Sequence, residues 1–259
     1  MKLEVITHEP VMDRKPEPLL FVHGAWHGAW CWNEHFLPYF AEHGYEAHAL
    51  SLRGHGKSEI DGSLRVARMR DYVADVVSVA EGLSSPPVLI GHSMGGLIVQ
   101  MYLEDHSAPG GVLLASDPVR GVLGATLRIA KRHPGAFLKA NLVWNLYPIV
   151  ATPELAREAF FTESMPDELV ATYHRQLQAE SYLGYLDMIF RLPKPERVKT
   201  PMLVMGAEKD TIFTPAEVAA TAAAYKTEPV MVSGMGHDMM LESGWQEVAA
   251  TILKWLEDR

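Results

Sequence analysis

Residues 88–96 read V-L-I-G-H-S-M-G-G, and this stretch decides how the rest of the chain is interpreted. Its first part, Val88 to Ile90, is a short apolar run typical of a strand that is buried on both faces. A G-x-S-x-G string centred on Ser93 follows, and then a nearly all-apolar segment from Gly95 to Leu103 that predicts a buried helix. A strand, a sharp turn and a helix in this order lift a serine hydroxyl clear of a sheet. Ser93 is therefore a candidate nucleophile.

The alternation of strand, loop and helix continues on both sides of this motif. Further short apolar runs predict strands at residues 19–22, 45–50, 112–115, 202–205 and 229–232. Amphipathic patterns predict helices over 71–81, over 215–225 behind a capping box at Thr214, and from Trp245 to Leu256. There are no internal repeats. This pattern predicts an α/β fold with a mostly parallel central sheet flanked by helices.

One block departs from the alternation. Residues 120–195 contain only helical patterns and aromatics punctuated by prolines, which predicts a helical cap or lid inserted into a core formed by residues 1–119 and 196–259. Ligand sites of such sheets lie at the carboxyl ends of the strands, so a lid is favoured over extra scaffold. Seven residues of the insertion could line an apolar pocket or simply pack: Phe160, Phe161, Tyr173, Tyr182, Tyr185, Met188 and Phe190.

Two further residues complete a candidate catalytic triad. A serine hydroxyl is a weak nucleophile at neutral pH unless a base takes its proton. His237 is the candidate base, because it lies in a glycine-containing loop after the run 229–232. The base needs a carboxylate that fixes its tautomer, and Asp210 follows the run 202–205. Asp117 also follows an apolar run and is the rival carboxylate, but a turn or helix-cap role explains it simply, so Asp210 is preferred.

Acyl transfer also requires backbone N–H groups that point at the developing oxyanion. One donor is expected from Met94, the residue after the nucleophile. The second is expected from the loop that follows the strand at 19–22, and we assign it to Ala25.

Composition and charge narrow the class of partner. The chain has 259 residues, 48% of them hydrophobic, and a net charge of −9, which disfavours binding to nucleic acid or to anionic lipid. Cys31 is the only cysteine, so no disulfide forms within the chain. No secretory signal or long apolar span is found, which predicts a cytoplasmic protein with no membrane insertion, either monomer or homodimer. His23 and His27 are four residues apart among glycines rather than on a helix face, so we expect no metal and no cofactor.

The motifs together resemble the α/β-hydrolase family along the whole chain, and the order Ser93, Asp210, His237 is the one described for that family. The segment from Arg53 to Ser58, R-G-H-G-K-S, resembles one common in bacterial members. The string H-G-A-W-H-G-A-W-C-W at residues 23–32 is similar to the opening loop of the methylesterase and hydroxynitrile-lyase branch. That branch would also place an oxyanion donor at Ala25.

Two departures from that branch bear on the reaction. Hydroxynitrile lyases are expected to carry threonine at position 24 and lysine at position 238, where this chain has Gly24 and Asp238. The sequence therefore predicts a serine hydrolase that cleaves an acyl or small aromatic carboxylic ester through an acyl-enzyme. Carbon–carbon bond, lactone or amide hydrolysis and cofactor-free perhydrolysis use the same triad and remain alternatives. A receptor-like binding protein is a further alternative, although a receptor has no need of His237.

Overall fold

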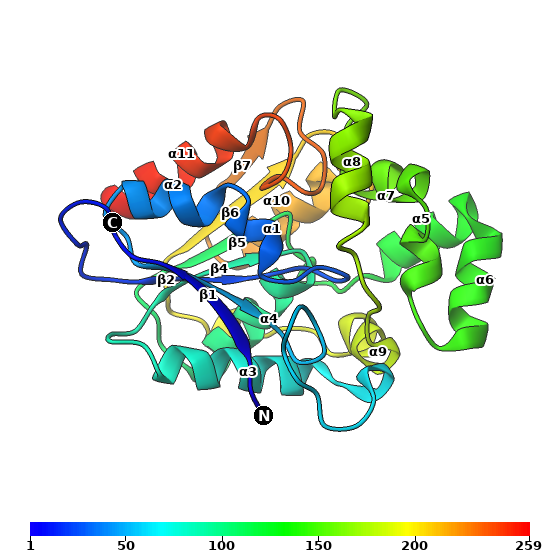
Figure 1. The fold of residues 1–259 in the computed structure, drawn as a ribbon, viewed down its shortest axis with the longest axis horizontal. Coiled ribbons are helices and arrows are strands. Elements are labelled where there is room, and N and C mark those ends of the chain that lie inside the picture. The colour runs from blue at the N-terminus through cyan, green and yellow to red at the C-terminus, as the bar shows by residue number, and fades with distance from the viewer.

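The computed structural model describes all residues from Met1 to Arg259. Its strands are β1 (Glu4–His8), β2 (Leu19–Val22), β3 (Ala47–Ser51), β4 (Val88–His92), β5 (Gly111–Leu114), β6 (Met202–Ala207) and β7 (Pro229–Val232). They form one sheet in the order β1-β3-β2-β4-β5-β6-β7 (Figure 1). Only β1 is antiparallel to its neighbour, and every other pair is parallel. The predicted fold class, with its mostly parallel sheet, is confirmed.

Helices cover the sheet on both faces, as parallel strands require. One face carries α1 (Trp30–Asn33), α2 (Phe36–Glu42) and α11 (Trp245–Glu257), and the other carries α3 (Met69–Glu81), α4 (Met94–Asp105) and α10 (Pro215–Ala224). Alternate residues of β2 separate the two cores. Leu19 and Phe21 belong to the first, and Leu20 and Val22 to the second. The sheet is thus buried on both sides, which explains its continuous apolar strands.

The insertion between β5 and β6 consists of helices and connecting loops and contains no strand. It contains α5 (Leu123–Arg132), α6 (Pro134–Val143), α7 (Pro153–Phe160), α8 (Asp167–His174) and α9 (Tyr182–Phe190), together with a short 3₁₀ turn at Tyr147–Val150. These helices gather at one end of the sheet, away from α2 and α11, and α9 lies beside α3 (Figure 1). No helix in the fold is both long and apolar enough to cross a membrane.

Buried polar contacts fasten this insertion to the core domain. Glu180, which precedes α9, accepts a hydrogen bond from Tyr72 of α3 at 2.8 Å and lies 3.1 Å from Nε2 of His55. Asp187 of α9 accepts a hydrogen bond from Nε of Arg68 at 2.8 Å. The insertion is therefore anchored on the side of its last helix.

The elements differ from the predicted ones mainly at their ends. Strand β7 begins and ends as predicted, whereas β3 begins two residues later than expected and β4 and β6 extend two residues further. Strand β1 was not predicted. Its residues alternate between half-buried and exposed positions, as befits an edge strand with one solvated face.

Candidate active site

Ser93 lies on the tight turn between β4 and α4, and its backbone is strained. Its φ is +50°, a left-handed value that is uncommon for a residue with a side chain. The turn is held because the Ser93 amide donates to the Leu114 carbonyl at 3.1 Å, and the Ser93 carbonyl accepts from the Asp117 amide at 3.1 Å. A side chain at Gly95 would collide with the carbonyl of Val22, so only glycine permits this close packing of helix on strand. The glycine pattern of the motif is thus a steric requirement of the turn.

His237 and Asp210 are brought together by the loops that follow β7 and β6. Nδ1 of His237 lies 2.8 Å from Oδ2 of Asp210, and both side chains are almost completely buried. The other oxygen of Asp210 accepts hydrogen bonds from the amides of Ile212 at 2.7 Å and Phe213 at 3.0 Å. These bonds fix the orientation of the carboxylate toward the imidazole.

The surroundings of His237 raise the pKa of its imidazole. Burial by itself lowers the pKa of His237, but the charge of Asp210 and the hydrogen bond to it outweigh burial and raise the pKa above its ordinary value of 6.5. His92, the residue before Ser93, donates from Nε2 to the His237 carbonyl at 3.0 Å. The histidine loop is therefore tied directly to the serine turn.

The rival carboxylate, Asp117, makes no hydrogen bond to His237. Neither of its side-chain oxygens has a partner, and the side chain is fully buried. Burial is the main reason that the pKa of Asp117 is raised to about 7. Of the two candidates, only Asp210 contacts the imidazole in this structure.

The two expected oxyanion donors flank the serine. Met94 is the first residue of α4, and Ala25 lies in the loop after β2. Neither amide donates to a carbonyl in the surrounding turns. A Cβ added at Gly24 would lie 3.0 Å from Cβ of Ser93 and 2.8 Å from Nδ1 of His92, so this loop runs against the nucleophile turn. The same contact shows why a residue with a side chain does not fit at position 24 here.

A buried pair that sequence reasoning missed lies behind this loop. Nε2 of His27 is 2.9 Å from Oδ2 of Asp238, and Nδ1 of His27 is 2.8 Å from the Ala25 carbonyl. Both side chains are at most 1% exposed. Asp238 was singled out only as a departure from the lyases, and nothing local in the sequence indicates its partner 211 residues away.

The four histidines around the site, His23, His27, His92 and His237, have protein partners for most of their ring nitrogens. His23 accepts from the Leu52 amide at 3.0 Å and faces the Gly24 carbonyl at 2.8 Å, so it does not act together with His27. The one cluster with the spacing of a metal site is His92, His237 and Asp238, whose ligand atoms lie within 4.8 Å of one another. In this cluster Nδ1 of His237 is already bonded to Asp210, and Oδ2 of Asp238 to His27.

Ser93 opens onto a small apolar cavity of about 70 Å³. Twelve of its fifteen lining residues are hydrophobic, and they come from the Ala25 loop, from the insertion and from the loop after Asp210. Tyr185 and Met188 of the insertion line it, as suggested, whereas Phe160, Phe161 and Tyr173 pack in the core. Tyr182 donates to Asn141, and Phe190 is 76% exposed. The insertion therefore forms one wall of the space above Ser93.

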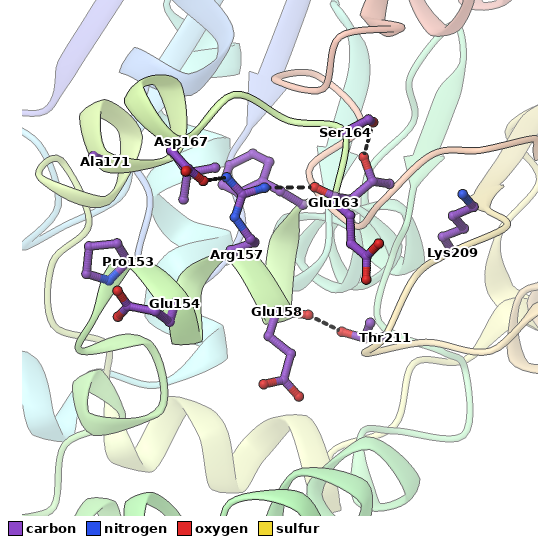
Figure 2. Close-up of a pocket in the computed structure, with 13 residues that line it drawn as sticks. Pro153, Glu154, Arg157, Glu158, Glu163, Ser164, Asp167, Ala171, Lys209 and Thr211 are labelled. Carbon is purple, nitrogen blue, oxygen red and sulfur yellow. Dashed lines mark hydrogen bonds and ion pairs between the residues drawn. The ribbon is translucent and has the colours of Figure 1, made fainter.

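A much larger groove of about 1280 Å³ lies outside this cavity, between α7, α8 and the loop at 209–211 (Figure 2). Its lining is mostly polar. Arg157 crosses it, donating to Asp167 at 2.5 Å and to the Thr162 carbonyl at 3.1 Å. Lys209 and Thr211, which flank Asp210, border the groove, but Asp210, Ser93 and His237 do not. The groove carries no candidate nucleophile, so the smaller cavity is the candidate active site.

A mostly parallel sheet that presents a serine on the turn from β4 to α4 defines a protein with the α/β-hydrolase fold. The chain belongs to the alpha/beta hydrolase family, whose family model matches residues 19–251. It is similar to Methylesterase 18 of Arabidopsis thaliana, with 24% identity over 217 residues that cover 76% of this chain and 80% of that protein. A pFDCC methylesterase of the same plant is 26% identical over 221 residues, covering 79% of each chain.

The fold of BpoC from Mycobacterium tuberculosis, described as a non-heme bromoperoxidase, is also similar. Its TM-score is 0.80 at 19% identity, over 100% of this chain and 96% of that one. This similarity concerns the fold only. The match to the family model confirms the predicted relationship to α/β-hydrolases.

Proposed function

We propose that the protein is a carboxylic-ester hydrolase that uses Ser93 as nucleophile, His237 as general base and acid, and Asp210 as the carboxylate that orients His237. The observation that carries the proposal is the 2.8 Å contact between His237 and Asp210, beside a serine held on a strained turn. This arrangement supplies the base and the orienting group that a serine nucleophile needs. Sequence similarity to two methylesterases supports an ester as the substrate.

In this mechanism the Ser93 hydroxyl attacks the ester carbonyl while its proton passes to Nε2 of His237. The oxyanion of the tetrahedral intermediate accepts hydrogen bonds from the amides of Ala25 and Met94. The alcohol leaves with the proton from His237, and an acyl-enzyme remains on Ser93. Water, deprotonated by His237, then attacks the acyl group and regenerates the serine.

The insertion at residues 120–195 acts as a lid in this proposal. It covers Ser93 through Ala125, Tyr185 and Met188, and it is anchored to the core through Glu180. The cavity it closes, about 70 Å³, is roughly half of the ~150 Å³ that accepts a benzene ring in an engineered apolar cavity. We therefore expect small acyl groups to be preferred.

The direct test is hydrolysis of p-nitrophenyl esters from acetate to long acyl chains, with Ser93→Ala as the inactive variant. Removal of a triad serine should lower turnover by about 10⁶-fold. Ser78→Ala, at an exposed position of α3, is the matched control and should behave as wild type. Equal activity in wild type and Ser93→Ala would refute the proposed nucleophile. Activity on none of the esters would favour carbon–carbon bond, lactone or amide hydrolysis, or perhydrolysis.

A further inference from the structure

Asp117 is a buried carboxyl group that neither the fold nor the proposed triad uses. Its side chain is fully buried, and both Oδ1 and Oδ2 lack a hydrogen-bond partner. Its backbone is firmly held: the amide donates to Ser93 at 3.1 Å, and the carbonyl accepts from Gln100 at 2.9 Å. Because those bonds are made by main-chain atoms, any residue at position 117 could make them. The carboxyl therefore contributes nothing visible to holding the strand end.

Such a group is costly to keep. A buried polar group without a partner destabilises a protein by about 1–3 kcal/mol, and more if it is charged. Burial raises the pKa of Asp117 to about 7, so the group partly escapes this cost by binding a proton. Unsatisfied buried groups in folded proteins call for an explanation, and a functional site is a frequent one.

The position of the Asp117 carboxyl indicates that it contacts a bound ligand. Asp117 lines the same cavity as Ser93, and the other lining residues that carry a polar group are Trp26, Thr126 and Tyr185. The Thr126 hydroxyl is already the acceptor for Tyr185, at 3.2 Å. Besides Ser93, the Asp117 carboxyl and Nε1 of Trp26 are the polar groups of this lining that have no partner, and of these two only the carboxyl can accept a hydrogen bond from a bound molecule. Ligand sites commonly combine an apolar lining with a few polar groups that set specificity.

We propose that Asp117 is a specificity-determining residue that hydrogen-bonds a hydroxyl group of the substrate, so that the preferred substrates are small hydroxy-substituted esters. A hydroxyl suits this carboxyl in either protonation state, because it can donate to a carboxylate and can accept from a carboxylic acid. An ammonium group would instead require a dehydrated cation in a cavity whose remaining lining is apolar, which is costly. The small volume restricts the substrate to short chains. This inference rests on the proposed ester hydrolysis at Ser93.

The experiment compares matched esters in which a hydroxyl replaces a methyl group: methyl lactate against methyl isobutyrate, and methyl β-hydroxybutyrate against methyl isovalerate. The measured quantity is kcat/KM for each ester with wild type, Asp117→Leu and Asp117→Asn. In wild type, kcat/KM for the hydroxy ester of at least one pair should exceed that for the methyl analogue by about tenfold or more. The methyl analogue is disfavoured because its binding leaves the buried Asp117 carboxyl without a hydrogen-bond partner. Asp117→Leu should abolish or reverse the preference, whereas Asp117→Asn should keep part of it.

Thermal denaturation provides a second readout. Asp117→Leu should melt at or above the wild-type temperature, because it removes an unpartnered buried carboxyl, whereas Asp117→Asn leaves an unpartnered amide and should melt near the wild-type temperature. Equal preference in wild type and Asp117→Leu would overturn the inference. So would an equal loss of activity on every ester in a folded variant, which would indicate a role in the reaction rather than in selectivity.

The two proposals fail in different ways. Hydrolysis without a hydroxyl preference refutes the role of Asp117 and leaves the ester hydrolase intact. If no ester is cleaved, calorimetric binding of the matched esters to Ser93→Ala, with and without Asp117→Leu, still decides whether the carboxyl recognises the hydroxyl. Binding that is independent of Asp117 would overturn the inference.

Discussion

Replacement of His27 by phenylalanine tests whether the pair that it forms with Asp238 is charged. Both ring nitrogens of His27 face acceptors, the Ala25 carbonyl at 2.8 Å and a carboxylate oxygen of Asp238 at 2.9 Å. A neutral imidazole has one N–H donor, so both hydrogen bonds to an ionised Asp238 require the imidazolium. Burial by itself raises the pKa of Asp238, but the charge of His27 and its hydrogen bond hold the pKa below 3.8. The geometry thus describes a buried, hydrogen-bonded pair whose charge the substitution tests.

His27→Phe keeps the aromatic contacts with Trp30 and Phe160 but removes both hydrogen bonds and leaves the carboxylate of Asp238 without its cation. Removing one partner of a buried ion pair costs about 3–5 kcal/mol of unfolding free energy. We expect a loss of this size near neutral pH, measured by urea or guanidinium unfolding. The double variant with Asp238→Asn should be less unstable than the sum of the single variants, because no buried charge remains unpaired.

The sign of the pH dependence follows from the lowered pKa of Asp238. The stabilisation from this carboxylate is complete above its unfolded-state pKa of 3.8 and is lost as the pH falls through the lower folded-state value. A destabilisation below about 1 kcal/mol near neutral pH, with additive single effects in the cycle, would refute a charged pair. It would indicate instead that Asp238 is protonated and donates to a neutral ring.

Three further outcomes concern the site itself. On p-nitrophenyl acetate, Asp210→Asn should lower kcat by about 10⁴-fold, whereas the kcat of Asp117→Asn should stay within about tenfold of the wild-type value. A larger loss in Asp117→Asn than in Asp210→Asn would show that Asp117 is the carboxylate that orients the base. The acid limb of the kcat/KM profile should have its midpoint above pH 6.5, because the raised pKa of His237 leaves the base protonated and inactive below it. A midpoint below pH 6.5 would contradict this environment. Gly24→Ala, whose Cβ would lie 2.8 Å from His92, should lower kcat/KM at least about tenfold, while Gly135→Ala, with nothing within 4 Å, should not.

The fold could be predicted because its determinants are local. Short apolar runs, the amphipathic stripe of 71–81 and the glycines around Ser93 each reflect the backbone and burial requirements of their own segment. The ends of the elements were predicted less accurately. The last two residues of β4 and of β6 are in the strand because they pair with neighbouring strands, which the sequence of each segment does not show. Strand β1 escaped prediction because its short alternating pattern becomes a strand only through its pairing with β3.

The sequence by itself determined the fold class, the serine turn and a short list of candidate partners, because chain order and glycine spacing are visible in one dimension. Only the tertiary structure showed that Asp210 lies within hydrogen-bonding distance of His237 and that the Asp117 carboxyl has no partner, since both residues follow strands. It alone joined His27 to Asp238 across 211 residues and left the Asp117 carboxyl without a partner in the cavity. Partners and burial are properties of packed neighbours, and packing brings together residues that no local pattern connects.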